Sequence, residues 1–307
     1  MKKLRVRSVI ELAGLVALSF GVWHEKSLIV SSWQTIKNSN AKLVIACFAL
    51  AWLNYLWSGL GYKFLAPKID LFKMCLVNLA SSGPGRVIPG GAGYLSFGIL
   101  FLRKQAIQTQ KAVAIAVVNN LLGFLVNALV LCFIFILNPS LLNKLGIASL
   151  RLDVLLVAVA VVLLIVLIIN HNERAKKSTI KAKQELYALG IQIVKHPGQF
   201  AALAVVMLAT IETNSTILLL AGHAVNMPIA FDQAILVMSV GVGVGSLLPT
   251  PGGVGGVEAG LLAALLVLGF DKTAAGGTVL IYRAATYLQP FIPGLVSYIY
   301  LRKKKLL

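Results

Sequence analysis

Long apolar stretches alternate with short polar segments along the whole chain. Six of these stretches approach or exceed the length of a membrane crossing, at residues 8–22, 41–61, 112–137, 152–170, 198–222 and 273–300. A helix of roughly 20 apolar residues spans the hydrocarbon core of a bilayer. The pattern therefore predicts an all-α polytopic membrane protein with about six full transmembrane helices.

Two further apolar segments, residues 70–102 and 232–270, are interrupted by proline and glycine. The first contains Gly-Pro-Gly-Arg-Val-Ile-Pro-Gly-Gly-Ala-Gly from residue 83, and the second contains Gly-Ser-Leu-Leu-Pro-Thr-Pro-Gly-Gly-Val-Gly from residue 245. Broken helices at membrane depth occur where protein or a water-filled cavity satisfies the backbone. Paired breaks in the two halves of a chain indicate a transport site. A chance match in a glycine-rich chain is the alternative.

Hydrophobic residues make up 58% of the 307 residues, and charged residues only 12%. A soluble core could not hide so much apolar surface. The net charge of +18 comes from basic clusters that lie between the apolar stretches, so anionic lipid headgroups are the expected partners and nucleic acid is not. We expect the basic N-terminus and residues 8–22 to form a retained helix, not a cleaved signal peptide.

The charge pattern also predicts the topology. If each broken segment is a re-entrant hairpin, six crossings remain and both termini, with the basic connection 171–196, lie in the cytoplasm. Residues 1–137 and 152–307 then form two halves of one membrane domain, 1–307, with opposite orientation. The result is an inverted-topology repeat, whose two hairpins enter from opposite faces.

Ionisable residues within membrane segments are costly to bury, so each is a functional candidate. Arg86 lies in the first break and Glu258 follows the second, while Glu212 and Arg283 lie in later helices. The arginines could hold an anionic headgroup, and either glutamate could bind a proton or pair with an arginine. An internal arginine–glutamate pair that only fixes packing is the alternative. Asn78, Asn119, Asn120 and Asn127 are expected to form hydrogen bonds between helices.

The residues of the two breaks are the other candidates for substrate binding. Glycine lets backbone N–H groups approach a ligand, and a helix that restarts after a break presents free N–H donors to an anion. The candidates are Gly90, Gly91, Gly93, Pro251, Gly252, Gly253 and Gly255. Close packing between helices is the alternative role of the glycines. Asp70 and Asp232 are expected to be the N-caps of the two hairpins.

Motifs of covalent catalysis are absent from the sequence. It contains no Walker A sequence, no His-Glu-x-x-His and no Gly-x-Ser-x-Gly, and its three cysteines lack metal or redox spacing. We therefore expect a protein that is not an enzyme, has no catalytic residues and binds neither metal nor cofactor.

The second break and the helix after it carry a family resemblance. The run Leu-Pro-Thr-Pro-Gly-Gly-Val-Gly-Gly-Val-Glu at 248–258, with Tyr282 and Arg283, resembles the transmembrane region of lysylphosphatidylglycerol synthases, the flippase-like part of multiple peptide resistance proteins. The resemblance covers nearly the whole chain. Relatives often carry an acidic residue after the first break and a charged pair in the next helix, where this chain has Tyr94 and Asn119-Asn120.

The resemblance implies that the protein moves a lipid between leaflets of a prokaryotic cytoplasmic membrane. The lipid would be an anionic or aminoacylated phospholipid, or a polyprenyl-phosphate-linked one. The aminoacyl-transferring domain of full-length synthases is not in this sequence, so we expect no lipid aminoacylation by the chain alone. A small-solute or ion transporter and a non-catalytic partner of a glycosyltransferase or synthase remain alternatives, as does a homo-oligomeric assembly.

Overall fold

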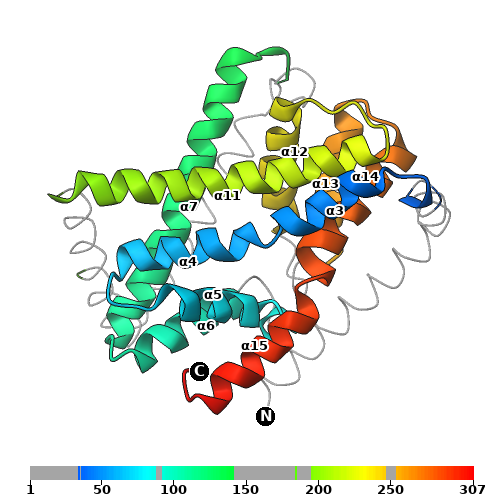
Figure 1. Cartoon of the computed structure of the whole chain (residues 1–307). Coiled ribbons are helices and arrows are strands. Elements are labelled where there is room, and N and C mark those ends of the chain that lie inside the picture. Colours follow the sequence, from blue (N-terminus) through cyan, green and yellow to red (C-terminus); the bar gives the residue numbers. More distant parts are fainter. Residues whose placement is uncertain (1–33, 35, 88–91, 142–183, 185–194, 247–253) are drawn as a thin grey trace, which may run out of the picture.

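The computed structural model describes residues 34, 36–87, 92–141, 184, 195–246 and 254–307, which are helical with short connections and contain no strand (Figure 1). This confirms the all-α fold class. The helices expected at 8–22 and 152–170 lie outside the described residues, as does nearly all of the basic connection 171–196.

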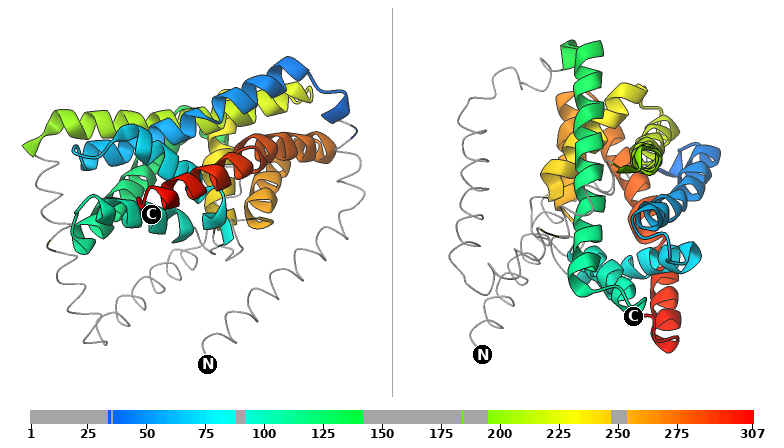
Figure 2. Two further views of the ribbon diagram at one scale, coloured as in Figure 1. Left: turned by 60° about the horizontal axis from the view of Figure 1, so that its bottom comes forward. Right: turned by 90° about the vertical axis from the view of Figure 1, so that its left-hand side faces the viewer.

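Three described helical stretches are long and apolar enough to cross a membrane: Ala41–Leu65, Thr109–Leu137 and Pro197–Ala224. The first consists of α3 (Ala41–Leu50) and α4 (Leu53–Leu65), so the helix expected at 41–61 is interrupted at Ala51 and Trp52 and runs further. The others are α7 (Thr109–Leu137) and α11 (Pro197–Ala224). Helix α11 packs along both α3 and α4, as Figures 1 and 2 show from three directions.

Each broken segment forms two helices that pack against each other. The first consists of α5 (Leu71–Ser81), a 3₁₀ turn at Pro84–Val87 and α6 (Ala92–Lys104). The second consists of α12 (Phe231–Ser246) and α13 (Gly256–Val267). Proline lacks the backbone N–H that a continuing helix needs, and glycine is a poor helix former. Helices α5 and α12 therefore end at the proline–glycine runs, as the sequence predicted.

The two aspartates that precede these hairpins differ in their roles. Asp70 is the N-cap of α5, and its carboxylate accepts a hydrogen bond from the N–H of Lys73 at 2.9 Å, as expected. The prediction for Asp232 was wrong, because α12 begins one residue earlier. Asp232 instead accepts a hydrogen bond from the side-chain amide of Asn138 at 2.8 Å, which ties the end of α7 to the start of α12.

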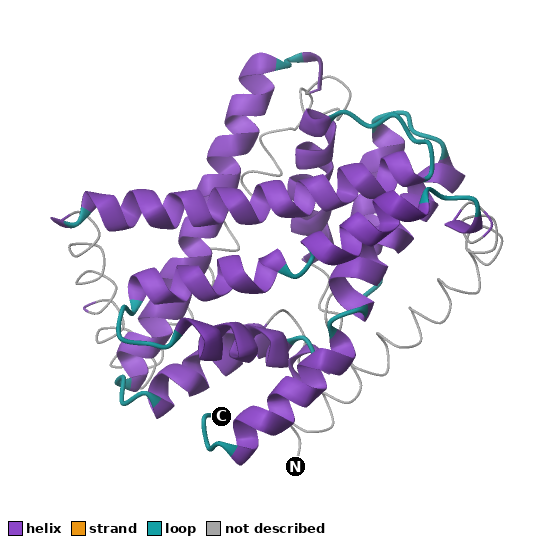
Figure 3. Ribbon diagram, viewed as in Figure 1, coloured by secondary structure: helices purple, strands orange, loops and turns teal. Residues whose placement is uncertain are grey.

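The last helix is interrupted, although the sequence predicted one helix over 273–300. The structure has α14 (Lys272–Arg283), a π-helical segment at Ala284–Leu288 and α15 (Phe291–Lys303), with a short turn between them (Figure 3). Pro290 cannot donate the backbone hydrogen bond of a continuing helix, which explains the interruption. A π segment inside a helix often marks a functional site.

Basic residues are concentrated at one set of helix ends. Helices α4, α6 and α15 end, and α7 and α11 begin, at the left and lower left of Figure 1. Basic residues occupy the last turns of these three helices: Lys63, Arg103, Lys104, Arg302 and Lys303. The α5–α6 hairpin begins and ends on this basic side, whereas α12–α13 begins and ends towards the upper right.

Close backbone contact joins α5 to α15. A Cβ atom at Gly294 would lie 2.6 Å from the carbonyl oxygen of Leu79 and 2.8 Å from the nitrogen of Gly83. Side chains at these positions would hold the two helices apart, because real Cβ atoms do not approach backbone so closely. This contact holds the first break against the interrupted last helix.

Candidate functional site

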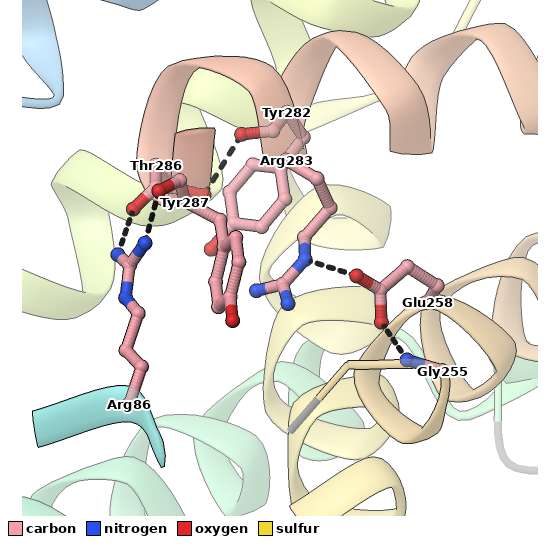
Figure 4. A network of polar contacts seen from close by, with 7 residues as sticks. All are labelled: Arg86, Gly255, Glu258, Tyr282, Arg283, Thr286 and Tyr287. Atoms are coloured by element: carbon pink, nitrogen blue, oxygen red, sulfur yellow. Dashed lines mark hydrogen bonds and ion pairs between the residues drawn. The ribbon is translucent and has the colours of Figure 1, made fainter. Parts of the chain in front are cut away.

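The first break sends a charged side chain across to the π-helical segment. Arg86 lies in the 3₁₀ turn, and its guanidinium donates hydrogen bonds to the backbone carbonyls of Thr286, at 3.3 Å, and Tyr287 (Figure 4). Guanidinium offers five donors in a planar fork, so two carbonyl bonds leave further donors for a ligand. No described acidic residue forms an ion pair with Arg86.

Tyr287 lies between two arginines. The Cζ atom of Arg86 is 3.8 Å from the centre of the tyrosine ring, and that of Arg283 is 4.3 Å from it. Figure 4 shows the two guanidinium groups on opposite sides of the ring. Each cation–π contact stabilises its arginine by about 0.5–2 kcal/mol, depending on desolvation. The tyrosine thereby holds two like charges near each other within the membrane protein.

The second break contributes the counter-charge. Nε of Arg283 donates to Oε1 of Glu258 at 2.6 Å, and the two side chains are 13% and 30% exposed. Oε2 of Glu258 accepts a hydrogen bond from the N–H of Gly255 at 2.7 Å, which caps α13. Gly255 has φ of +83°, a conformation that favours glycine. Glu258 therefore fixes both the helix end and Arg283.

A cavity of about 280 Å³ opens beside Arg86. Asn78, only 2% exposed, and Gln289 line it, and neither Nδ2 of Asn78 nor Oε1 of Gln289 has a hydrogen-bond partner among the described residues. Both atoms are buried away from the open space of the cavity, while Tyr55, Ser58 and Asn214 add polar side chains to its lining beside Arg86. The cavity is therefore equipped to bind a polar group beside a positive charge.

The structure brings together four of the predicted site residues: Arg86, Gly255, Glu258 and Arg283. It does not bring Glu212 to them, because Glu212 lies on α11, lines neither described cavity and forms no ion pair with a described residue.

The predicted glycines and proline of the breaks have separate outcomes. Gly93 packs against the first turn, where a Cβ would overlap the carbonyl oxygen of Gly85, which matches the close-packing alternative. The remaining predicted residues lie outside the described part of the chain: Gly90, Gly91, Pro251, Gly252 and Gly253.

Sequence reasoning missed Tyr287 and Gln289. Tyr287 follows Arg283 by four residues, so helical spacing could have placed the ring beside that arginine. Asn78 was expected only to bond between helices, and the structure leaves its buried amide nitrogen without a partner among the described residues. Within the described ranges, no three His, Cys, Asp or Glu side chains gather as a metal site.

A comparison with known families places the geometry in context. The family described as "Lysylphosphatidylglycerol synthase TM region" matches residues 9–294, which is most of the chain. No curated protein matches the chain.

Proposed function

Because the chain belongs to the lysylphosphatidylglycerol synthase TM region family, a family of membrane domains with lipid-related function, we propose that it moves an anionic lipid between leaflets. The lipid is an anionic or aminoacylated phospholipid or a polyprenyl-phosphate-linked lipid. The proposal is translocation, without covalent chemistry on the lipid.

The observation that carries this proposal is the excess positive charge of the site. Arg86 and Arg283 flank Tyr287, and Glu258 neutralises only one of them. An unpaired charge inside a membrane protein is expensive, so Arg86 has a strong tendency to bind an anion. A phosphodiester beside Arg86 would also meet the polar side chains that line the same cavity, among them Ser58 and Asn214.

The proposed transport route uses the two hairpins as opposed re-entrant elements of an inverted repeat. Support comes from the helix ends: α5–α6 starts and ends on the basic side, and α12–α13 on the other. The basic side is then cytoplasmic, as are both termini, in the inner membrane of a prokaryote. The two breaks meet through the residues that bind the headgroup, as a site reached alternately from both sides requires.

Leaflet exchange in liposomes tests the proposal. Purified protein is reconstituted with NBD-labelled phosphatidylglycerol, and the fraction of label reached by dithionite is followed with time. We expect wild-type protein to accelerate exchange and Arg86→Gln to slow it about tenfold or more, since a charge-assisted hydrogen bond contributes about 1.5–3 kcal/mol. Arg103→Gln, at the exposed end of α6, is the matched control and should behave as wild type.

The proposal is wrong if protein-containing and empty liposomes exchange the label at the same rate. It is equally wrong if Arg86→Gln and wild type cannot be distinguished while both elute as folded protein. Uptake of a small solute that needs no lipid substrate would favour the transporter alternative, and normal cellular function of Arg86→Ala and Glu258→Ala would favour a partner of a lipid-modifying enzyme.

A further inference from the structure

A second, larger cavity lies beside the first. Its volume is about 540 Å³, within the usual range for small-molecule sites, and residues of α4, α6, α7, α11, α12 and α14 line it. It shares Ser58, Tyr94, Thr210 and Asn214 with the Arg86 cavity. A single headgroup could therefore place one part in each cavity, with these four residues between the parts.

The larger cavity has an uncharged described lining in which polar side chains lie among apolar ones, such as Phe124 and Met207. Three asparagines of α7 line it, Asn119, Asn120 and Asn127, and none of its described lining residues is Asp, Glu, Lys or Arg. Asn119 is 8% exposed, and its Oδ1 has no hydrogen-bond partner among the described residues. This oxygen packs against α4, where a Cβ at Gly61 would lie 2.5 Å from it, so Asn119 belongs to the contact between α4 and α7 and leaves Asn120 and Asn127 as the amides that can face a ligand.

The other two amides are only partly occupied. Asn120 donates from Nδ2 to the carbonyl of Ala116 at 2.8 Å, and Asn127 accepts at Oδ1 from the hydroxyl of Ser239 at 2.7 Å. Each bond uses one end of its amide, and no described residue bonds the opposite end, which leaves it available to a ligand. An amide offers both donors and acceptors, which matches a hydroxyl group that donates and accepts in turn.

The boundary between the cavities is itself hydrogen-bonded. Asn54 and Asn214 exchange amide bonds of 3.3 and 2.9 Å, and the hydroxyl of Tyr282 donates to Oδ1 of Asn214 at 3.2 Å. Ser58 and Tyr94 form a second pair. Because the two cavities share lining residues and Arg86 lines the first, the uncharged cavity lies next to a positive charge.

We infer that the larger cavity binds a neutral, hydroxyl-rich group attached to the phosphate that Arg86 holds. The inference rests on the proposed function and names the class of lipid: a phosphate ester with a sugar or other polyol headgroup. An aminoacyl headgroup fits poorly, because its ammonium offers only donors and meets no carboxylate in the described lining of this cavity. The aromatic lining side chains can pack on a sugar face or on a cation, so they do not distinguish the two headgroups. The amides are the side chains that favour the polyol.

Competitive binding in detergent tests this inference without requiring transport. Native mass spectrometry compares three lipid probes: phosphatidic acid, with phosphate alone; phosphatidylinositol, with a neutral polyol; and lysylphosphatidylglycerol, with a cationic aminoacyl group. The protein variants are wild type, the double variant Asn120→Leu with Asn127→Leu, and Gln108→Leu. Gln108, exposed at the start of α7 and outside both cavities, is the matched control.

We expect wild type to bind phosphatidylinositol at least about tenfold more tightly than lysylphosphatidylglycerol. The double variant should lose about tenfold in phosphatidylinositol affinity and keep its affinity for phosphatidic acid, while Gln108→Leu changes neither. Equal or tighter binding of lysylphosphatidylglycerol overturns the inference, as does an equal loss for phosphatidic acid or no binding of phosphatidylinositol by wild type.

The two proposals can fail separately. If the binding preferences hold but labelled lipid does not change leaflet, translocation is wrong and the polyol site stands. If lysylphosphatidylglycerol is exchanged faster than phosphatidylinositol and binds more tightly, translocation stands and the polyol site is wrong.

Discussion

Removing the charge of Glu258 while keeping a hydrogen-bonding oxygen separates the two roles of this side chain. Glu258→Gln can still accept the N–H of Gly255, now 2.7 Å away, but it no longer neutralises Arg283. A fully buried pair loses about 3–5 kcal/mol when one partner is removed, and an exposed pair about 0–1 kcal/mol. With Arg283 13% and Glu258 30% exposed, we expect about 2 kcal/mol for Glu258→Gln. Glu258→Ala also removes the helix cap and should cost about 1 kcal/mol more.

A double-mutant cycle with Arg283→Gln measures the pair itself. Unfolding free energies of wild type, both single variants and the double variant are compared in one detergent, by denaturant titration. We expect a coupling energy of about 1.5–2 kcal/mol, because Arg283 without Glu258 is left next to Arg86 across the tyrosine ring. A coupling energy below about 0.5 kcal/mol would refute the reasoning. So would a Glu258→Gln variant that is as unstable as Glu258→Ala, since the cap would then contribute nothing.

Two further predictions concern the contacts that hold the site. Gly294→Ala should destabilise the protein by about 1–3 kcal/mol, because its Cβ would meet the backbone of α5. The control Gly198→Ala has open space at its Cβ and should not destabilise the protein. Equal thermal midpoints for the two variants would contradict the close contact. Tyr287→Leu should destabilise the protein by about 1–2 kcal/mol relative to Tyr287→Phe, because phenylalanine keeps the ring between the guanidinium groups. Equal unfolding free energies of the two variants would show that the ring contacts contribute nothing.

The sequence predicted the features that depend on local backbone chemistry. The proline–glycine runs ended α5 and α12, and Asp70 capped α5 as expected. The apolar run 273–300 has the length of one crossing and so predicts one helix, whereas the structure interrupts it near Pro290. Proline in a membrane helix can be accommodated by neighbouring helices, so its presence alone does not predict a break.

The centre of the site depends on contacts between distant segments. Arg86 and Tyr287 are 201 positions apart, and no periodicity connects them. Their approach follows from the contact between α5 and α15, where glycine at position 294 lets the helices touch. Arg283 and Glu258 were predicted as an alternative pairing, since an isolated charge in a membrane needs a partner. The sequence could not predict which arginine pairs with the glutamate, or that a tyrosine lies between the two arginines. Both features depend on how distant helices pack.

The two breaks share a sequence motif but are linked to the last helix by opposite chemistry. In the first break, the guanidinium of Arg86 contacts backbone carbonyls and the face of Tyr287. After the second break, the carboxylate of Glu258 forms an ion pair with Arg283. A ligand changes a conformational equilibrium only through contacts that differ between states. Under the proposed function, a phosphate bound at Arg86 would also attract Arg283 across the ring of Tyr287. It would therefore weaken the ion pair between Arg283 and Glu258 and so loosen the second break from the last helix. Arg283 is thus the residue through which headgroup binding at one hairpin would alter the other.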